Sequence, residues 1–232
     1  MANYYITGDK HGYMKCFKPF SDKFGTDLSD IMIILGDAGL NYYLDTYDIL
    51  TKDELKYVPM TFFCVHGNHE ERPYNIEGYK LVDFKGAKAY VEDLFPNIYF
   101  AKDGEIYDFD GKKVICIGGA HSVDKYYRLE NGYNWFESEQ PNDEIKTYVE
   151  QQLDKVDWKI DYVFTHTCPT RVIPTDMFLE GLDQSTVDSS TEEWLNAIEQ
   201  KLDYSKWFCG HWHTDRLVDN IRFMFDDIIE LN

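Results

Sequence analysis

The sequence has no long hydrophobic run. Its densest apolar stretch, residues 31–35, has the length of a strand and falls far short of the roughly 20 apolar residues that span a bilayer. The first residues carry neither a basic region nor an apolar core, so we expect no signal peptide. These absences argue against a membrane protein and against an exported one.

Cysteine is scarce, and no two of the five cysteines have the close spacing of a zinc knuckle. Their odd number does not suit a disulfide framework, so we expect reduced, mostly buried thiols in a cytoplasmic protein. Internal repeats, low-complexity tracts and proline-rich linkers are also missing. We therefore expect residues 1–232 to form one domain, which is long enough to bury a real core.

Positive charge is scarce as well. The chain has 23 Lys and Arg against 42 Asp and Glu, a formal net charge of −19. A uniformly acidic surface repels polyanions, so we expect no long duplex nucleic acid among the partners. The sequence leaves the oligomeric state open. With 44% hydrophobic and 16% aromatic residues, the chain is nevertheless globular rather than disordered.

What the sequence does have is an alternation of short apolar runs and helical stretches. The apolar runs, rich in residues that favour strands, are 4–6, 31–35, 62–65, 162–164 and 207–209. The helical stretches are 45–57, 143–156 and 191–202. Such alternation predicts an α/β fold. Turn signals and aromatic residues at about 97–140 predict an embellishing hairpin and aromatic segment over the functional site.

Each of the five apolar runs leads into a short polar motif, and together the motifs contain five of the seven histidines. The motifs are Asp9-Lys10-His11-Gly12, Gly36-Asp37-Ala38-Gly39, Gly67-Asn68-His69-Glu70, Thr165-His166-Thr167 and Gly210-His211-Trp212-His213. In open α/β sheets, ligands bind beyond the carboxyl ends of the strands. We therefore expect all five motifs to converge on one edge.

This ordered set of motifs resembles that of the calcineurin-like metallophosphoesterases. The stretch Gly118-Gly119-Ala120-His121-Ser122-Val123-Asp124, followed by Arg128, resembles one found in small bacterial and phage members of that family. The resemblance implies a four-layer αββα sandwich of two mixed sheets, with a dinuclear metal site at the carboxyl ends of the strands. It also implies a metal-dependent hydrolase of phosphate esters. Carboxylate, amide and imidazole ligands suit manganese, which we expect, with Fe, Zn, Co or Ni as alternatives.

The resemblance also gives each motif residue a role. Asp9, His11 and His213 would hold one metal and Asp37 would bridge the pair. The ligands of the second metal would be Asn68, His166 and His211. His69 would not bind metal but would assist the leaving group while a hydroxide activated by both metals attacks phosphorus in line.

The chain departs from one branch of the family. Glu70 is typical of the phosphoprotein phosphatases, but those enzymes carry Asp-Arg where this chain has Leu40 and Asn41. The carboxylate partner of His69 is therefore missing at that position, and Glu70 is a candidate to replace it.

Substrate contacts must then come from elsewhere in the chain. Arg72 and Arg128 are candidates for binding phosphate, and His121 for lining the pocket. Cys168 is not expected to be a nucleophile, because activated hydroxide fills that role. We expect a small-molecule or phosphopeptide ester as substrate. Three interpretations stay open: a phosphomonoesterase, a phosphodiesterase, and a non-catalytic metal-binding scaffold of the same fold.

Overall fold

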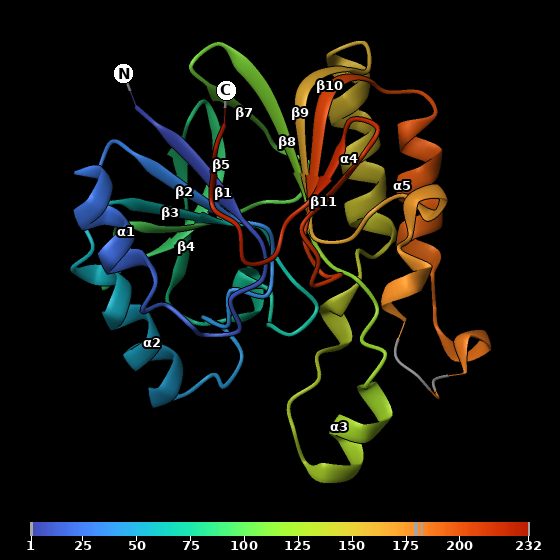
Figure 1. Cartoon of the computed structure of the whole chain (residues 1–232), viewed down its shortest axis with the longest axis horizontal. Coiled ribbons are helices and arrows are strands. Elements are labelled where there is room, and N and C mark those ends of the chain that lie inside the picture. The colour runs from blue at the N-terminus through green and yellow to red at the C-terminus, as the bar shows by residue number, and fades with distance from the viewer. Residues whose placement is uncertain (1, 179–180, 182, 232) are drawn as a thin grey trace.

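The computed structural model describes residues 2–178, 181 and 183–231, and it arranges their strands in two mixed sheets (Figure 1). In spatial order, the first sheet contains β13 (Ile229–Glu230), β1 (Tyr4–Thr7), β2 (Ile31–Ile34), β3 (Thr61–Cys64), β6 (Ile98–Ala101), β5 (Ala87–Glu92) and β4 (Tyr79–Phe84). The second contains β11 (Arg216–Val218), β12 (Ile221–Phe223), β10 (Asp203–Cys209), β9 (Lys159–Thr165), β8 (Lys112–Ile117) and β7 (Ile106–Phe109).

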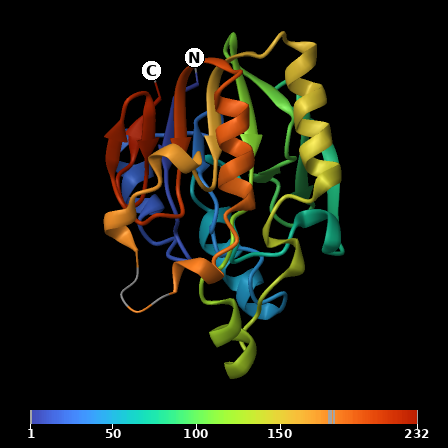
Figure 2. The same ribbon diagram turned by 90° about the vertical axis from the view of Figure 1, so that its right-hand side faces the viewer.

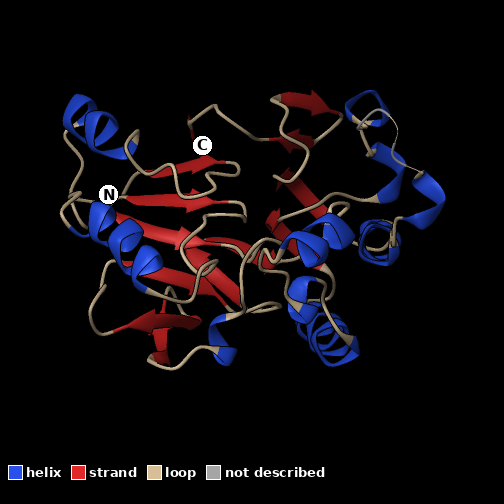
Figure 3. Cartoon of the chain, turned by 90° about the horizontal axis from the view of Figure 1, so that it is seen from below, coloured by secondary structure: helices blue, strands red, loops and turns tan. Residues whose placement is uncertain are grey.

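Helices cover the outer face of each sheet, while the inner faces pack together. On the first sheet lie α1 (Phe17–Phe24) and α2 (Thr46–Lys56), and on the second lie α4 (Asp143–Lys155) and α5 (Ser190–Glu199). Figure 3 shows helices on both outer sides with the strands between them, and Figure 2 shows α4 and α5 across one sheet. The predicted four-layer α/β sandwich is therefore confirmed.

The sequence of β2 explains why the sheet is buried on both faces. Ile31 and Ile33 point into the core between the sheets, whereas Met32 and Ile34 pack against the helical layer. Successive side chains of a strand point to opposite faces, so an unbroken apolar run satisfies two hydrophobic layers at once. Each such side chain contributes about 1.5–3 kcal/mol when it is fully buried.

The central strands are parallel and in register at their carboxyl ends. In the first sheet Ile34 of β2 pairs with Thr7 of β1 on one side and Cys64 of β3 on the other. In the second sheet Cys209 of β10 pairs with Thr165 of β9. The loops that follow these strands therefore leave the sheets at one level, where they can meet.

The three predicted helices are confirmed as α2, α4 and α5, within a few residues at each end. Asp45 and Asn142 cap the first two through their side chains. Short 3₁₀ turns lie in the loops, at Pro73–Asn75, Glu137–Glu139, Thr170–Val172, Thr175–Met177 and Gln184–Thr186. Within the described ranges, no helix has the length and apolar character needed to cross a membrane. The five cysteines are free thiols.

The segment predicted as an embellishment, 97–140, differs from that prediction in its first half. Here β6 joins the first sheet, while β7 and β8 form a hairpin that belongs to the second. The turn at Asp110 and Gly111 is present, with φ values of 52° and 89°. Local turn signals do not reveal which strand is the neighbour, and β8 pairs in parallel with the distant β9. The second half carries α3 (Lys125–Asn131), which projects from the body of the molecule (Figures 1 and 2).

Candidate metal centre

The five motifs meet at the carboxyl ends of the strands, as the alternation predicts. Asp9 and Asp37 follow β1 and β2, and Asn68 follows β3. His166 directly follows β9, and His211 lies just beyond β10. The two sheets thus contribute side chains to one cluster. Some of its members, such as His11 and His213, are 202 positions apart in the chain.

Asp9, His11 and His213 form the first group of converging ligand atoms. The Nε2 atom of His213 lies 3.1 Å from Nε2 of His11 and 3.3 Å from Oδ2 of Asp9. This buried Oδ2 atom has the two imidazoles of His213 and His11, at 3.3 Å and 3.9 Å, as its polar neighbours and accepts no backbone N–H. A buried carboxylate oxygen is normally paired, so its position here, facing two imidazole nitrogens, fits a cation ligand.

Asn68, His166 and His211 form the second group. Oδ1 of Asn68 lies 2.7 Å from Nε2 of His166 and 3.1 Å from Nδ1 of His211. The Nδ1 atom of His166 donates to the Leu35 carbonyl at 2.8 Å, which leaves Nε2 free to act as a ligand. The amide of Asn68 donates to Ser122 Oγ at 2.8 Å, and this bond turns Oδ1 toward the histidines.

Asp37 lies between the two groups. Its Oδ2 atom is 3.9 Å from Nδ1 of His11, and its Oδ1 atom is 3.7 Å from Nε2 of His166. The Oδ1 atom also accepts from the backbone N–H of His69 at 2.8 Å. One carboxylate with an oxygen toward each group is the arrangement that a shared ligand needs.

The electrostatics of Asp37 and His211 favour the protonation states that metal binding requires. Burial alone would raise the pKa of Asp37, but the imidazoles of His166, His69 and His11 hold it below its ordinary value. Burial lowers the pKa of His211 to about 3. The carboxylate is therefore ionised and the imidazole neutral, which are the forms that bind metal.

The backbone is strained at four predicted ligands, which supports a built site. His11, Asp37, His211 and His213 have φ values of 44°, 46°, 66° and 46°, a region that is costly for side chains other than glycine. The turn that separates His211 from His213 is thus made by the histidines themselves, not by the flexibility of Gly210. Gly210 instead provides space, because a Cβ atom there would lie 2.4 Å from Oδ1 of Asp9.

His69 has a carboxylate partner that sequence reasoning missed. Its Nε2 atom lies 3.5 Å from Oδ1 of Asp124, and its Nδ1 atom lies 3.0 Å from Nη2 of Arg128. Arg128 in turn donates from Nε to Asp124 at 2.7 Å and from Nη1 to Tyr42 at 3.0 Å. The four-residue spacing of Asp124 and Arg128, which suits one helical face, was the available signal. Burial lowers the pKa of His69, but Asp124 and Asp37 raise it above its ordinary value overall.

Glu70 does not partner His69. It is fully buried, and its Oε1 atom accepts from the backbone N–H of Gly67 at 2.9 Å. Burial, followed by the nearby carboxylate of Asp37, raises the pKa of Glu70 to about 8. Its role is to hold the loop that presents Asn68 and His69.

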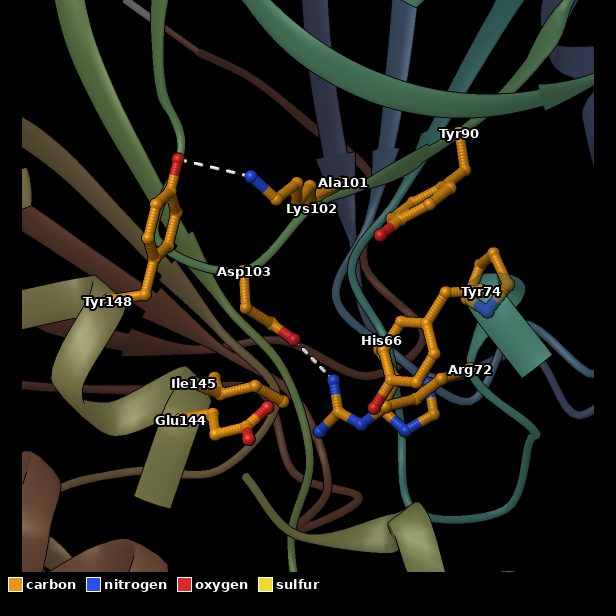
Figure 4. Close-up of a pocket in the computed structure, with 11 residues that line it drawn as sticks. His66, Arg72, Tyr74, Tyr90, Ala101, Lys102, Asp103, Glu144, Ile145 and Tyr148 are labelled. Atoms are coloured by element: carbon orange, nitrogen blue, oxygen red, sulfur yellow. Dashed lines mark hydrogen bonds and ion pairs between the residues drawn. The ribbon is translucent and has the colours of Figure 1, made fainter. Parts of the chain in front are cut away.

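The prediction that Arg72 contacts the substrate is wrong. The side chain is only 2% exposed, forms an ion pair with Asp103 and donates from Nε to the Ser138 carbonyl at 2.8 Å. It lines a separate cavity of about 170 Å³ (Figure 4). A 3₁₀ helix begins just after this arginine, and Arg72 is not among the described residues that line the cavities beside His69. His121 does line the cavity that contains His69, where its Nδ1 atom lies 3.4 Å from Glu139.

Solved structures similar to this chain bear on its fold. One solved crystal structure has 17% sequence identity and a TM-score of 0.52, covering 96% of this chain and 89% of its own. At that identity the likeness shows the fold alone. A protein of unknown function from Aquifex aeolicus, 14% identical over 72% of this chain and 81% of its own, has a TM-score of 0.26, too low to support an argument. The comparison with curated proteins found no match.

The sequence profile of the calcineurin-like phosphoesterases matches residues 3–215, which contain all five motifs. Its members use divalent metal ions, and the Asp and His groups described above could bind such ions. The profile covers all four of the helices α1, α2, α4 and α5 and the strands from β1 to β10, while β11, β12 and β13 follow it in the chain. This chain therefore belongs to the calcineurin-like phosphoesterase family.

Proposed function

We propose that this protein hydrolyses phosphate esters at a dinuclear metal centre. The observation that carries the proposal is the position of Asp37, whose two oxygens face two separate groups of ligand atoms. Asp9, His11 and His213 would hold one ion, and Asn68, His166 and His211 the other. The mixture of oxygen and imidazole ligands suits manganese, with Fe, Zn, Co or Ni as alternatives. When bound, two such ions polarise a phosphoryl group and lower the pKa of an attacking water.

His69 is the proposed proton donor to the leaving oxygen. Its ring is fixed by the Asp124 carboxylate at Nε2 and by the Arg128 guanidinium at Nδ1. Because a guanidinium only donates, Nδ1 accepts in this arrangement, and the neutral ring carries its proton on Nε2, toward Asp124. Burial and the Arg128 guanidinium lower the pKa of His69, but the carboxylates of Asp124 and Asp37 raise it above its ordinary value overall, which favours the protonated imidazole that a general acid needs.

Arg128 is the proposed phosphate contact. Its side chain is only 14% exposed and is held by Asp124 and Tyr42 beside His69. Held in this way, the guanidinium can meet a phosphoryl oxygen with little further ordering. The phosphoprotein phosphatases carry an aspartate and an arginine where this chain has Leu40 and Asn41. In the proposed site, Asp124 and Arg128 take their place.

The experiment is an assay of manganese-loaded protein on 4-nitrophenyl phosphate and its bis ester, with His69→Ala as the test variant. We expect the wild type to hydrolyse at least one ester. The variant should keep its metal and lose about 10²–10⁴-fold in turnover, the usual contribution of a general acid. No hydrolysis of either ester by the metal-loaded wild type would overturn the proposal. Loss of metal from the variant would show that His69 is a ligand instead.

A further inference from the structure

Two cavities with different linings adjoin the metal centre. The larger has a volume of about 550 Å³ and the smaller about 420 Å³. His11 and His69 line both cavities. A phosphoryl group held between these two histidines therefore has room for an organic group on each side.

The larger cavity has an apolar wall. Trp212 and Phe178 lie side by side in it, with ring centroids 6.1 Å apart and planes inclined at 34°. Ile173, Val187 and Val123 extend the wall. Broad aromatic surfaces of this kind bind apolar or aromatic groups.

The smaller cavity is more polar. It is lined by Tyr42, Tyr43, Thr51 and Arg128 together with two glycines. Hydroxyl groups and a guanidinium suit an organic group that carries oxygen or nitrogen acceptors. The two cavities thus differ in the chemistry that each can recognise.

Few cationic side chains surround the phosphoryl position. Among the described residues that line either cavity, Arg128 is the one lysine or arginine, and its charge is paired with Asp124 at 2.7 Å. Arg72, the other candidate, is committed to Asp103 elsewhere. The larger cavity adds Glu192, which is 5% exposed and whose Oε2 atom has no hydrogen-bond partner. These surroundings suit a phosphate with one negative charge better than a terminal phosphate with two.

From the two cavities and the scarcity of cationic side chains between them, we infer that the preferred substrate is a phosphodiester. One largely apolar or aromatic group lies against Trp212 and Phe178, and a second, more polar group lies beside Tyr43 and Thr51. The inference rests on the proposed hydrolase function and specifies its substrate class.

The reaction is a simple hydrolysis. The oxygen of one water forms a bond to phosphorus, and the bond from phosphorus to the leaving oxygen breaks. The leaving oxygen gains a proton from His69 and departs as an alcohol or phenol. The other product is the phosphomonoester of the remaining group, and the second proton of the water replenishes the proton that His69 gave.

The first test compares kcat/KM for bis(4-nitrophenyl) phosphate and 4-nitrophenyl phosphate, which share a leaving group. We expect the diester to be preferred by about tenfold or more, a typical difference for one additional apolar contact. A preference for the monoester would overturn the inference and leave the proposed hydrolase function intact. Failure to hydrolyse both would instead overturn the proposed function.

The second test assigns the cavities with Phe178→Ala in the larger one and Tyr43→Ala in the smaller one. A diester fills both cavities, so each variant should lower its kcat/KM by about 10-fold or more. A monoester has one organic group, so at most one variant should affect it. Tyr126→Ala, an exposed tyrosine of α3 that lines neither cavity, is the matched control. The inference is wrong if either cavity variant leaves diester hydrolysis unchanged.

Discussion

At the scale of residues, the structure shows which charged side chains contact His69. The loop after Asp37 provides none, because it carries Leu40 and Asn41 in place of an aspartate and an arginine. Leu40 is fully buried in the core under the helices, and Asn41 accepts from the hydroxyl of Tyr79 at 2.8 Å. Leu40 is therefore committed to packing and Asn41 to a hydrogen bond, so neither supports His69. The charges near His69 come instead from Asp124 and Arg128, more than 50 residues further along the chain.

Asp124→Asn should weaken catalysis without loss of metal. Removing the carboxylate takes away a group that raises the pKa of His69. The protonated imidazole then loses its proton at lower pH, so the alkaline limb of the kcat profile moves to lower pH. A shift of about one unit would lower turnover near that limb by about tenfold. The measurement is a pH profile of kcat with manganese-loaded protein.

Glu130→Gln, on the exposed face of α3, is the control for this change and should leave the profile in place. A merely structural role for Asp124 would lower kcat equally at every pH. That outcome would contradict the proposal that Asp124 acts by raising the pKa of His69.

Glu70 should make the stability of the metal-free protein depend on pH. Its pKa is about 8 in the folded chain, well above the ordinary glutamate value near 4.3. The unfolded chain therefore releases this proton first as the pH rises. The folded state loses stability from about pH 4 to pH 8, on the order of a few kcal/mol in total.

Glu70→Gln keeps an acceptor for Gly67 and cannot ionise, so it should flatten this dependence. The measurement is the free energy of unfolding in urea for both proteins at pH 5 and pH 9. If the free energy of unfolding changed equally between pH 5 and pH 9 in both proteins, Glu70 would ionise in the folded state as an ordinary glutamate does.

At the scale of elements, the parallel strands were the easiest to predict. Their unbroken apolar runs arise because both faces are buried, as in β2. The outer hairpin β4–β5 was missed because β4 lies at the edge of its sheet and is half exposed, so no apolar run marks it. The short helix α3 buries none of its residues, so it carries no apolar periodicity to detect.

The exposure of α3 also predicts that it is dispensable for folding but not for activity. Replacing residues 126–132 with a short Gly-Ser linker removes Arg128 and no buried side chain. We expect the thermal midpoint to change little and the metal content to be unchanged. The value of kcat/KM should fall by about 10²-fold, as expected for loss of one charged phosphate contact.

Arg128→Ala in the full-length chain is the comparison for this deletion. If Arg128 is the one residue through which α3 contributes to activity, the deletion and Arg128→Ala should lose activity to the same extent. A much larger loss in the deletion would mean that α3 has a second role at the site.

The loop before Asp37 offers a matched pair of glycines. Gly36 and Gly111 have φ values of 90° and 89°, so alanine is equally strained at both positions. A Cβ atom at Gly36 would lie 2.1 Å from Nδ1 of His166, whereas at Gly111 it would meet nothing within 4 Å.

Gly36→Ala should therefore displace His166 and lower manganese affinity, while Gly111→Ala should cost only the backbone strain, about 1–2 kcal/mol. The measurements are calorimetric metal titration and thermal unfolding of both variants. Equal metal affinity in the two variants would contradict the placement of His166 as a ligand.

At the scale of the whole molecule, the convergence of five loops was predictable and the surroundings of the site were not. Carboxyl ends of parallel strands meet at one edge, so the positions of Asp9, Asp37 and His166 follow from the alternation of elements. The paths of the loops do not. Arg72 was expected at the substrate and lies instead against Asp103 and the Ser138 carbonyl, partners 31 and 66 residues further along the chain that local sequence does not reveal.

The net charge of −19 is accompanied by a scarcity of cationic side chains at the proposed site. The site that we propose for an anionic substrate has one arginine beside it, and that arginine is paired. Attraction of the substrate must therefore come mainly from bound cations. High ionic strength should weaken substrate binding only modestly, because charges that are close and partly buried are screened least.

The most direct measurement is to titrate metal-free protein with manganese and follow ion binding and diester hydrolysis in the same samples. We expect two ions per chain and hydrolysis that appears as the second site fills. Asp37→Asn should lose both metal binding and hydrolysis. Full occupancy by manganese without hydrolysis of any phosphate ester, or unchanged metal content in Asp37→Asn, would contradict a bridged dinuclear centre that performs this reaction.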